Sequence, residues 1–317
     1  FFFKQKTAYE IVDCDWSSDV CSSDLAVEAA IKFARKFTGK TGMVAMNGSY
    51  HGKSLGSLSV TFNPKYRKSF MPLVDKVTFS PFGDIETLRT KIEDDTAFVI
   101  MEPIQGESGI NVAPDGFLQD VRKLCDERKI LLIFDEIQAG LGRTGKMWAS
   151  DHWNTIPDIM CLAKGIAGGV PMSATLTRPE ILAAMTKGEH SSTFGGNPLS
   201  CAAGIATLQA LTQDGLVDNA AKVGKFLMSG LEKLKQKHSI IRDVRGKGMM
   251  IGVEMKFEVK DILLDGIEEG VLLLYSGRNI LRFLPPLVMN EKEVTKVLEV
   301  LDKLFTKESE RRKNVQG

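Results

Sequence analysis

Short apolar runs separated by helical segments dominate the first part of the chain. Between residues 26 and 37 the apolar positions recur every three or four residues, which predicts a helix that stops at Gly39. The segments that follow contain apolar runs of strand length, and these predict buried strands. The predicted strands lie at residues 43–46, 97–101, 130–134, 159–162 and 172–176.

Helical segments separate several of these strands. We predict helices at residues 85–92, 115–128 and 179–185. Strands that alternate with helices are typical of a mostly parallel sheet flanked by helices, so we predict an α/β fold. Binding sites in such sheets lie beyond the carboxyl ends of the strands.

The pattern changes near residue 212. We predict a large α/β domain at residues 26–212, a smaller α+β domain at 213–306 and a polar tail at 307–317. The elements predicted around and beyond this boundary are helices at 198–211, 216–237 and 291–305 and strands near 249–254, 271–274 and 280–283.

Polar residues that could hold a cofactor follow two of the predicted strands. Asp135 and Gln138 follow the strand at 130–134, and Lys164 follows the strand at 159–162 and precedes a glycine-rich turn. We expect them to share one edge of the sheet. A pyridoxal phosphate (PLP) enzyme needs these three residue types. Lysine forms a Schiff base with the cofactor, a carboxylate keeps its pyridine nitrogen protonated, and an amide contacts its phenolate oxygen.

Each of these residues also has an ordinary structural explanation. A lysine after a strand is usually a solvated surface residue, and an aspartate that ends a buried strand often caps the next turn. Glycines beside a lysine can be simple turn residues. The joint occurrence of all three residue types is what favours the cofactor site.

The same part of the chain permits a nucleotide-binding interpretation. Residues 140–146 (Gly-Leu-Gly-Arg-Thr-Gly-Lys) fit the start of a phosphate-binding P-loop, and residues 130–136 could hold magnesium. Two features oppose this alternative, a P-loop NTPase. The next position is Met147, which offers no hydroxyl to the metal. A P-loop should also follow its own strand, separate from the acidic strand.

A set of short motifs carries a family resemblance. They are Tyr50-His51-Gly52, residues 102–107 (Glu-Pro-Ile-Gln-Gly-Glu), 134–138 (Phe-Asp-Glu-Ile-Gln), 162–164 (Leu-Ala-Lys), 192–198 (Ser-Thr-Phe-Gly-Gly-Asn-Pro) and 282–287 (Arg-Phe-Leu-Pro-Pro-Leu). In their order and spacing the chain resembles the class III (ω-amino-acid type) aminotransferases, PLP enzymes of fold type I, from residue 26 to residue 304. It is most similar to the acetylornithine aminotransferase branch. Residues 56–61 and 64–67 also resemble enzymes that act on lysine or ornithine tethered to an amino-group carrier protein.

The resemblance implies how the chain binds the cofactor. Lys164 would be the Schiff-base lysine, and Asp135 would be the partner of the pyridinium nitrogen. Gln138 would contact the ring oxygen, and Tyr50 would stack on the ring face. Thr193 would reach the cofactor phosphate of the neighbouring subunit, which implies a homodimer with shared active sites.

The resemblance also implies a substrate pocket. Arg282 would bind the α-carboxylate of glutamate, and Glu107 would pair with Arg282 when a basic ω-amino donor occupies the site. Glu102 would line the same pocket. The family usually has arginine where this chain has Lys53, so a point charge replaces a planar bidentate group at that carboxylate-binding position.

The implied activity is transamination. An ω-amino donor such as N-acetylornithine, ornithine or carrier-bound lysine would pass its amino group to 2-oxoglutarate, in arginine or lysine biosynthesis. A 4-aminobutyrate-type aminotransferase remains an alternative. A PLP aminomutase, which shifts an amino group within one molecule, is another; it would share Lys164 and Asp135 and need no second oxo acid.

Composition argues against several other classes of protein. Lysine plus arginine (41) balance aspartate plus glutamate (40), so no charge excess points to nucleic acid or a membrane surface. The five cysteines show no metal-binding spacing, so no metal site or disulfide framework is indicated. No apolar run approaches a membrane span, and the first residues lack the apolar region of a secretory signal. We therefore expect a cytoplasmic protein.

Residues 1–25 fit none of these patterns. They contain Trp16, two of the five cysteines and a repeated Ser-Ser-Asp, and they resemble translated sequencing-adapter sequence. We interpret them as a non-native segment. Where the family has approximately Ser-Gly-Ala/Thr-Glu beside the cofactor phosphate, residues 22–25 read Ser-Ser-Asp-Leu. We expect the Asp24 carboxylate to weaken phosphate binding, and the activity of this chain to be low.

Overall fold

The computed structural model describes residues 22–316, with side chains from residue 23 to residue 313. The interpretation of residues 1–21 as part of a non-native segment lies outside the described residues. The described chain forms two compact units. The first contains residues 22–103, 113–141 and 150–211, and the second contains residues 104–112, 142–149 and 212–316. The main part of the second unit begins at residue 212, near which the sequence predicts a boundary. The prediction places residues 104–112 and 142–149 in the first domain, whereas they belong to the second unit.

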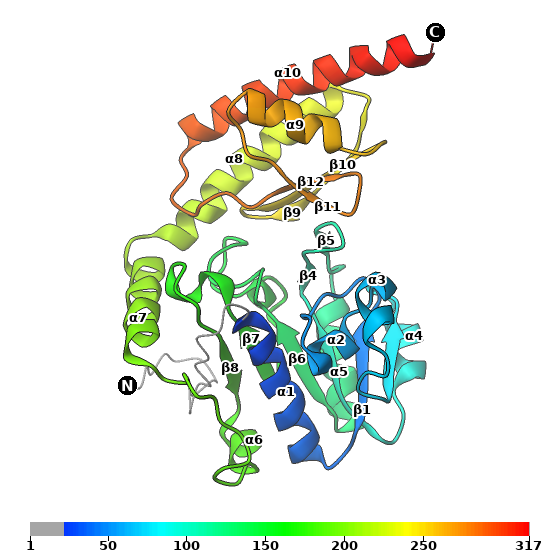
Figure 1. The fold of residues 1–317 in the computed structure, drawn as a ribbon, viewed down its shortest axis with the longest axis vertical. Helices are drawn as coiled ribbons and strands as arrows, with labels where there is room; N and C mark the ends of the chain where they lie inside the picture. The colour runs from blue at the N-terminus through cyan, green and yellow to red at the C-terminus, as the bar shows by residue number, and fades with distance from the viewer. Residues whose placement is uncertain (1–21, 317) are drawn as a thin grey trace. The chain divides into compact units, whose positions relative to one another are not determined.

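A six-stranded sheet forms the centre of the first unit (Figure 1). Its order is β2-β1-β3-β6-β7-β8, and every neighbouring pair is parallel except β7 and β8. The mostly parallel sheet expected from the sequence is confirmed. The strands are β1 (Gly42–Met46), β2 (Val77–Ser80), β3 (Thr96–Met101), β6 (Leu131–Asp135), β7 (Ile159–Leu162) and β8 (Ala174–Thr177).

Helices cover this sheet. Helix α1 crosses it in Figure 1 and packs against β3, β6, β7 and β8, while α5 packs against β6 and α4 against β2. The helices are α1 (Ser22–Thr38), α2 (Leu55–Val60), α3 (Pro64–Arg67), α4 (Ile85–Lys91), α5 (Phe117–Arg128), α6 (Pro179–Ala183) and α7 (Pro198–Gln213), with short 3-10 helices η1 (Lys68–Phe70), η2 (Ala149–Trp153) and η3 (Lys164–Ala167).

Burial on both faces of the sheet explains the continuous apolar runs in the sequence. Every residue of β6 is buried. Successive side chains of a strand point to opposite faces. Leu131 and Ile133 belong to a core cluster with Phe33 of α1, whereas Leu132 and Phe134 point to the opposite face and are also buried. A strand of this kind cannot show the alternation of a half-exposed sheet.

The second unit has a four-stranded antiparallel sheet in the order β11-β12-β10-β9. Helix α8 packs against β9 and α10, and α9 packs against α10. Strands β4 and β5 pair with each other within residues 104–112. The elements are β4 (Ile104–Gln105), β5 (Asn111–Val112), α8 (Leu216–Lys237), β9 (Ile241–Lys247), β10 (Met250–Met255), α9 (Lys260–Glu268), β11 (Leu274–Ser276), β12 (Ile280–Phe283) and α10 (Glu291–Gln316).

The last helix is longer than predicted. Helix α10 continues to Gln316, so the residues expected to form a polar tail (307–317) belong to a helix as far as they are described. Glu308 is 1% exposed and lies 2.7 Å from Arg311, which also reaches Asp265 of α9 at 3.0 Å. Beyond the last apolar positions of the periodic pattern, ion pairs between side chains stabilise this helix. Despite the length of α10, no described helix is both long and apolar enough to cross a membrane.

Polar edge strands also differ from the prediction. The sequence pattern does not predict β9, in which only Ile241 and Val244 are buried. The strand predicted at 271–274 is observed at Leu274–Ser276, because it pairs with residues 280–282 of β12. An edge strand with one buried face offers few apolar positions, so its register depends on its neighbour.

Close backbone contact in the second unit requires a glycine on α8. A Cβ at Gly224 would lie 2.2 Å from the carbonyl carbon of Gly248, an atom that cannot rotate away. In an exposed helix, glycine to alanine adds about 1 kcal/mol of stability. We predict that Gly224→Ala instead lowers the free energy of unfolding by about 1–3 kcal/mol, measured by urea denaturation. Ser229→Ala, on the exposed side of α8, is the control; a Gly224→Ala protein as stable as the parent would contradict the contact.

Candidate active site

Parallel strands of the first unit end at one edge of the sheet, and polar residues follow four of them. Residues 47–53 follow β1, Glu102 follows β3, Asp135 ends β6, and Lys164 follows β7. Asp135 and Cys161 are register partners on β6 and β7, so Lys164 lies shortly beyond the level of Asp135. The strand order therefore gathers residues that are distant in sequence at one edge.

A buried histidine–aspartate pair lies at this edge. Nδ1 of His51 is 2.8 Å from Oδ2 of Asp135, and their side chains are 0% and 4% exposed. The backbone N–H of Ile137 donates to Oδ1 of Asp135 at 3.0 Å. A buried carboxylate is costly unless it is paired and hydrogen-bonded. The two donors hold the carboxylate from two sides, and its remaining lone pairs can accept from a ligand.

Hydrogen bonds within residues 49–61 fix the position of His51. Its backbone N–H donates to Oγ1 of Thr61 at 2.9 Å. Gly52 has a φ of 133°, and a Cβ there would lie 2.5 Å from Oγ of Ser57, so the turn needs glycine at this position. The turn thus delivers the imidazole to the end of β6.

The carboxylate of Asp24 binds amides of the same turn. Its Oδ2 accepts from the backbone N–H groups of Lys53 at 2.6 Å and Ser54 at 3.0 Å. Glu28, also on α1, accepts from two N–H groups at the start of α2 at 2.8 and 3.0 Å and so caps that helix. The expected repulsion between Asp24 and a cofactor phosphate stays a prediction.

Several buried polar atoms at this edge have no hydrogen-bond partner among the described residues. Oε1 of Gln138 and Nε2 of His51 are among them. Leaving a buried polar group unpaired costs about 1–3 kcal/mol, so such atoms indicate a partner from outside the chain. Rotation of the Gln138 amide would present N–H donors in place of the oxygen. A polar aromatic ring such as that of PLP fits these groups.

Lys164 occupies a strained backbone position. Its φ is 47°, in a region that residues other than glycine rarely adopt. It begins η3, and Gly168 and Gly169 follow with φ values of 61° and 111°. Its side chain is exposed. Strain of this kind persists only where the surrounding structure enforces it and is typical of functional positions.

Tyr50, Glu102 and Lys53 lie around the turn after β1. The backbone N–H of Tyr50 donates to Oε1 of Glu102 at 3.1 Å, and Glu102 is buried. The rings of Tyr50 and Tyr66 meet edge to face with centroids 5.8 Å apart. Nζ of Lys53 lies 5.2 Å from the centroid of Tyr66. Among the described residues Lys53 has this ring contact and no ion pair, so its charge is available to a substrate carboxylate.

Thr193 lies on the exposed loop between α6 and α7. No hydrogen bond joins it to the other candidate residues in the described structure. The neighbouring apolar side chains Phe194 and Leu199 are 63% and 72% exposed. Oδ1 of Asn197 accepts from the backbone N–H of Ser200 at 2.9 Å, which caps α7.

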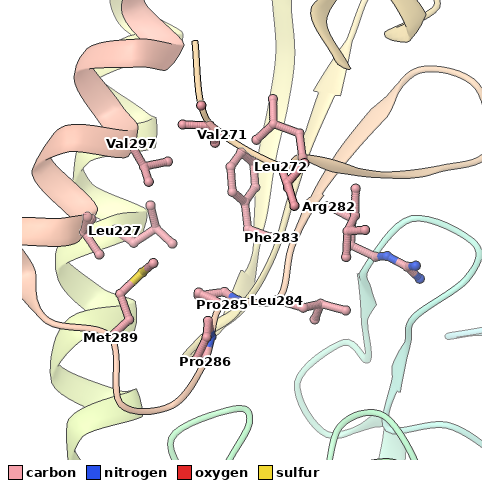
Figure 2. Close-up of a pocket in the computed structure, with 14 residues that line it drawn as sticks. Leu227, Val271, Leu272, Arg282, Phe283, Leu284, Pro285, Pro286, Met289 and Val297 are labelled. Atoms are coloured by element: carbon pink, nitrogen blue, oxygen red, sulfur yellow. The ribbon is translucent and has the colours of Figure 1, made fainter. Parts of the chain in front are cut away.

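Glu107 and Arg282 form an ion pair in the second unit. Nη1 of Arg282 lies 2.5 Å from Oε1 of Glu107, and the side chains are 13% and 37% exposed. Nε of Arg282 is buried without a hydrogen bond to any described residue. Figure 2 shows the guanidinium pointing away from apolar side chains, among them Phe283 and Leu284, that line a cavity of about 320 Å³.

Residues 140–147 form turns rather than a P-loop. The backbone N–H of Gly142 donates to the carbonyl of Met147 at 3.1 Å, and that of Gly145 donates to the carbonyl of Gly142 at 3.0 Å. The next element is the short 3-10 helix η2, not an α-helix whose N-terminus could face a phosphate. This local structure argues against the nucleotide-binding alternative.

His51 is the residue of this edge to which sequence analysis gives no role. It lies inside the motif Tyr50-His51-Gly52, in which the family resemblance implies a role only for the tyrosine. Its partner Asp135 is 84 positions away, and strand order alone brings the two together. A histidine directly before a glycine, after a predicted buried strand, was the available signal.

Comparison with known sequences identifies relatives over most of the chain. Residues 15–305 match the family described as aminotransferase class-III. The acetylornithine aminotransferase of Caldanaerobacter subterraneus subsp. tengcongensis is 42% identical over 288 residues, which cover 89% of this chain and 73% of the relative. Ornithine aminotransferase 1 of Staphylococcus saprophyticus is 43% identical over 291 residues, with the same coverage of 89% and 73%.

Solved structures share the fold. The ornithine aminotransferase of Toxoplasma gondii superposes with a TM-score of 0.89 at 31% identity, over 92% of this chain and 73% of that chain. An amine transaminase from an uncultivated Pseudomonas species, solved in its PLP-bound form, superposes with a TM-score of 0.86 at 30% identity, over 92% of this chain and 76% of that chain.

We predict that His51→Leu weakens PLP binding by about tenfold or more, because Asp135 loses one of its two donors. The dissociation constant is measured by titrating the protein with PLP and following the absorbance of the bound cofactor. His51→Asn is the matched control, since its side-chain N–H can replace the one at Nδ1 and should preserve most of the affinity. A His51→Leu protein with the affinity of the parent would show that the pair has no part in cofactor binding.

Proposed function

The chain belongs to the class III aminotransferase family and is a PLP-dependent aminotransferase of fold type I, and from this we propose that it moves an amino group from an ω-amino donor to 2-oxoglutarate. The donors that we propose are N-acetylornithine, ornithine or carrier-bound lysine, in arginine or lysine biosynthesis. Relatives named acetylornithine and ornithine aminotransferases support the first two donors.

The observation that carries this proposal is the ion pair between Glu107 and Arg282. Glutamate brings its α-carboxylate to the reacting end of the pocket, whereas an ω-amino donor brings no carboxylate there. Arg282 would bind the carboxylate of glutamate, and Glu107 would neutralise Arg282 when the ω-amino donor is bound. A buried guanidinium without a partner is costly. The 2.5 Å ion pair with Glu107 neutralises the charge of Arg282 when no substrate carboxylate is bound to it.

The residues around the turn after β1 suit the distal end of the donor. Lys53 would attract a carboxylate there as a point charge, with less demand on geometry than the usual arginine. Glu102, buried beneath the backbone of Tyr50, would shape the same pocket. This arrangement favours a donor with a carboxylate at the end opposite its reacting amine.

The carboxyl edge of the first unit would hold the cofactor. When bound, PLP supplies an electron sink that makes a hydrogen on the substrate carbon acidic. Lys164 would bind the cofactor covalently. Once displaced by the donor amine, its free amine would take the proton from that carbon as general base and deliver it to C4′ of the cofactor as general acid. Asp135, oriented by His51, would keep the pyridine nitrogen protonated. Gln138 would donate to the ring oxygen, and Tyr50 would cover one ring face.

A homodimer with shared active sites is part of the proposal. Thr193 of one subunit would reach the cofactor phosphate in its partner. The exposed apolar side chains of Phe194 and Leu199 beside it support an interface at this loop. An amino-group carrier protein is the corresponding partner if the donor is tethered lysine or ornithine; the resemblance at residues 56–61 and 64–67 supports it. We propose that the reaction takes place in the cytoplasm.

A donor panel tests the function. The PLP-loaded protein is mixed with N-acetylornithine, ornithine or 4-aminobutyrate, and the absorption spectrum of the bound cofactor is followed. We expect N-acetylornithine or ornithine to change the spectrum fastest, and 2-oxoglutarate to restore it. A preference for 4-aminobutyrate would favour the 4-aminobutyrate-type alternative, and turnover without any oxo acid would indicate an aminomutase.

A further inference from the structure

Arg143, in the glycine-rich segment at 140–147, has no role in the proposed function. Its Nη1 donates to the main-chain oxygen of Pro285 and lies 3.4 Å from that of Met249. The backbone N–H of Met249 donates back to the carbonyl of Arg143 at 2.9 Å. Pro285 follows β12, the strand that carries Arg282. Arg143 therefore ties the turn to the main chain just beyond Arg282.

No carboxylate contacts the guanidinium of Arg143 among the described residues, where it meets only these two carbonyls. Burial lowers the pKa of Arg143 to about 10, because the charged group loses hydration that the carbonyls replace only in part. A buried charge of this kind adds little to the stability of the fold. The guanidinium instead fixes the positions of the two main-chain carbonyls that it binds.

A second arginine holds the segment that carries Glu107. Nε of Arg245 donates to the main-chain oxygen of Gly109 at 2.9 Å. The hydroxyl of Ser276 donates to the main-chain oxygen of Glu107 itself. Arg245 is fixed in turn by Glu254, whose Oε2 lies 2.7 Å from its Nη1. Side-chain donors therefore hold the main chain on the Glu107 side, as Arg143 does on the Arg282 side.

We propose that Arg143 and Arg245 are positioning residues that set the separation of Arg282 and Glu107, each by holding the main chain next to one member of the pair. This inference rests on the proposed roles of Arg282 and Glu107. Displacing a binding group by about 1 Å can lower a rate by about 100-fold. The short contact between the two side chains therefore depends on both main-chain anchors.

The two anchors have opposite effects on substrate choice. When Arg143 is lost, Arg282 is less well placed for a carboxylate, so efficiency with glutamate falls more than efficiency with the ω-amino donor. When Arg245 is lost, Glu107 neutralises Arg282 less often, so glutamate gains over the ω-amino donor. A residue that only stabilised the fold would change both efficiencies together.

The experiment compares kcat/KM for glutamate with kcat/KM for the preferred ω-amino donor in the PLP-loaded protein. Methionine keeps much of the length of arginine without its charge. We expect the ratio of glutamate to ω-amino donor to fall about threefold to tenfold in Arg143→Met and to rise about threefold in Arg245→Met. Arg143→Lys, which can donate to one carbonyl, should recover part of the ratio.

Arg242→Met is the matched control. Arg242 lies on the same strand as Arg245 and pairs with the same Glu254 at 2.9 Å, but it makes no hydrogen bond to residues 104–112 in the described structure. Its removal should leave the ratio unchanged. Unfolding midpoints are measured for every variant. Where a methionine variant does not fold, the lysine variant at that position replaces it, with the same expected sign and a smaller size.

Equal losses with both substrates in the Arg143 and Arg245 variants would overturn this inference. Arg282→Lys and Glu107→Ala test the underlying function separately. If Arg282→Lys leaves the KM for 2-oxoglutarate unchanged, the proposed role of the pair fails, and the inference fails with it. If Arg282→Lys lowers the ratio of glutamate to ω-amino donor and Glu107→Ala raises it, while the two anchor variants leave it unchanged, only this inference fails.

Discussion

The buried contact between His51 and Asp135 is the interaction on which the candidate active-site edge depends. A carboxylate that is 4% exposed needs donors, and it finds them in the loop after β1 and in its own backbone at Ile137. The His51 donor is available only if β1 and β6 end at the same edge, as parallel strands do, whereas the Ile137 donor is only two residues from Asp135. Lys164 reaches that edge for the same reason, since β7 is parallel to β6. The need of the buried Asp135 carboxylate for hydrogen-bond donors and the parallel direction of the strands thus explain why these residues lie at one edge.

Much of the large α/β unit follows from local pattern. The run at residues 130–134 is continuously apolar because both faces of β6 are buried, and a run of that kind predicts a parallel sheet before any coordinates are known. Asp135, Gln138 and Lys164 are candidates because they follow such runs. The same reasoning does not identify His51. Its role depends on strand order across 84 positions, which neither periodicity nor spacing encodes.

The second unit shows where local pattern fails. Strand β9 is polar at most positions and gains its register from β10, and α10 continues through charged residues that pair with one another and with α9. The glycine-rich segment at 140–147 is ambiguous for a related reason. Its glycines permit either a phosphate cradle or close backbone packing, and only the surrounding structure distinguishes the two. In this structure the segment places the Arg143 guanidinium against the main-chain carbonyls of Met249 and Pro285.

We propose that the carboxyl edge of the parallel sheet holds PLP through Lys164. Borohydride reduction of the PLP-loaded protein, followed by peptide mapping, identifies the lysine involved, because reduction makes the link to the cofactor permanent. We expect the phosphopyridoxyl group on Lys164, in the peptide that follows β7. A label on Lys146, the lysine of the glycine-rich segment, or on any other lysine would contradict it.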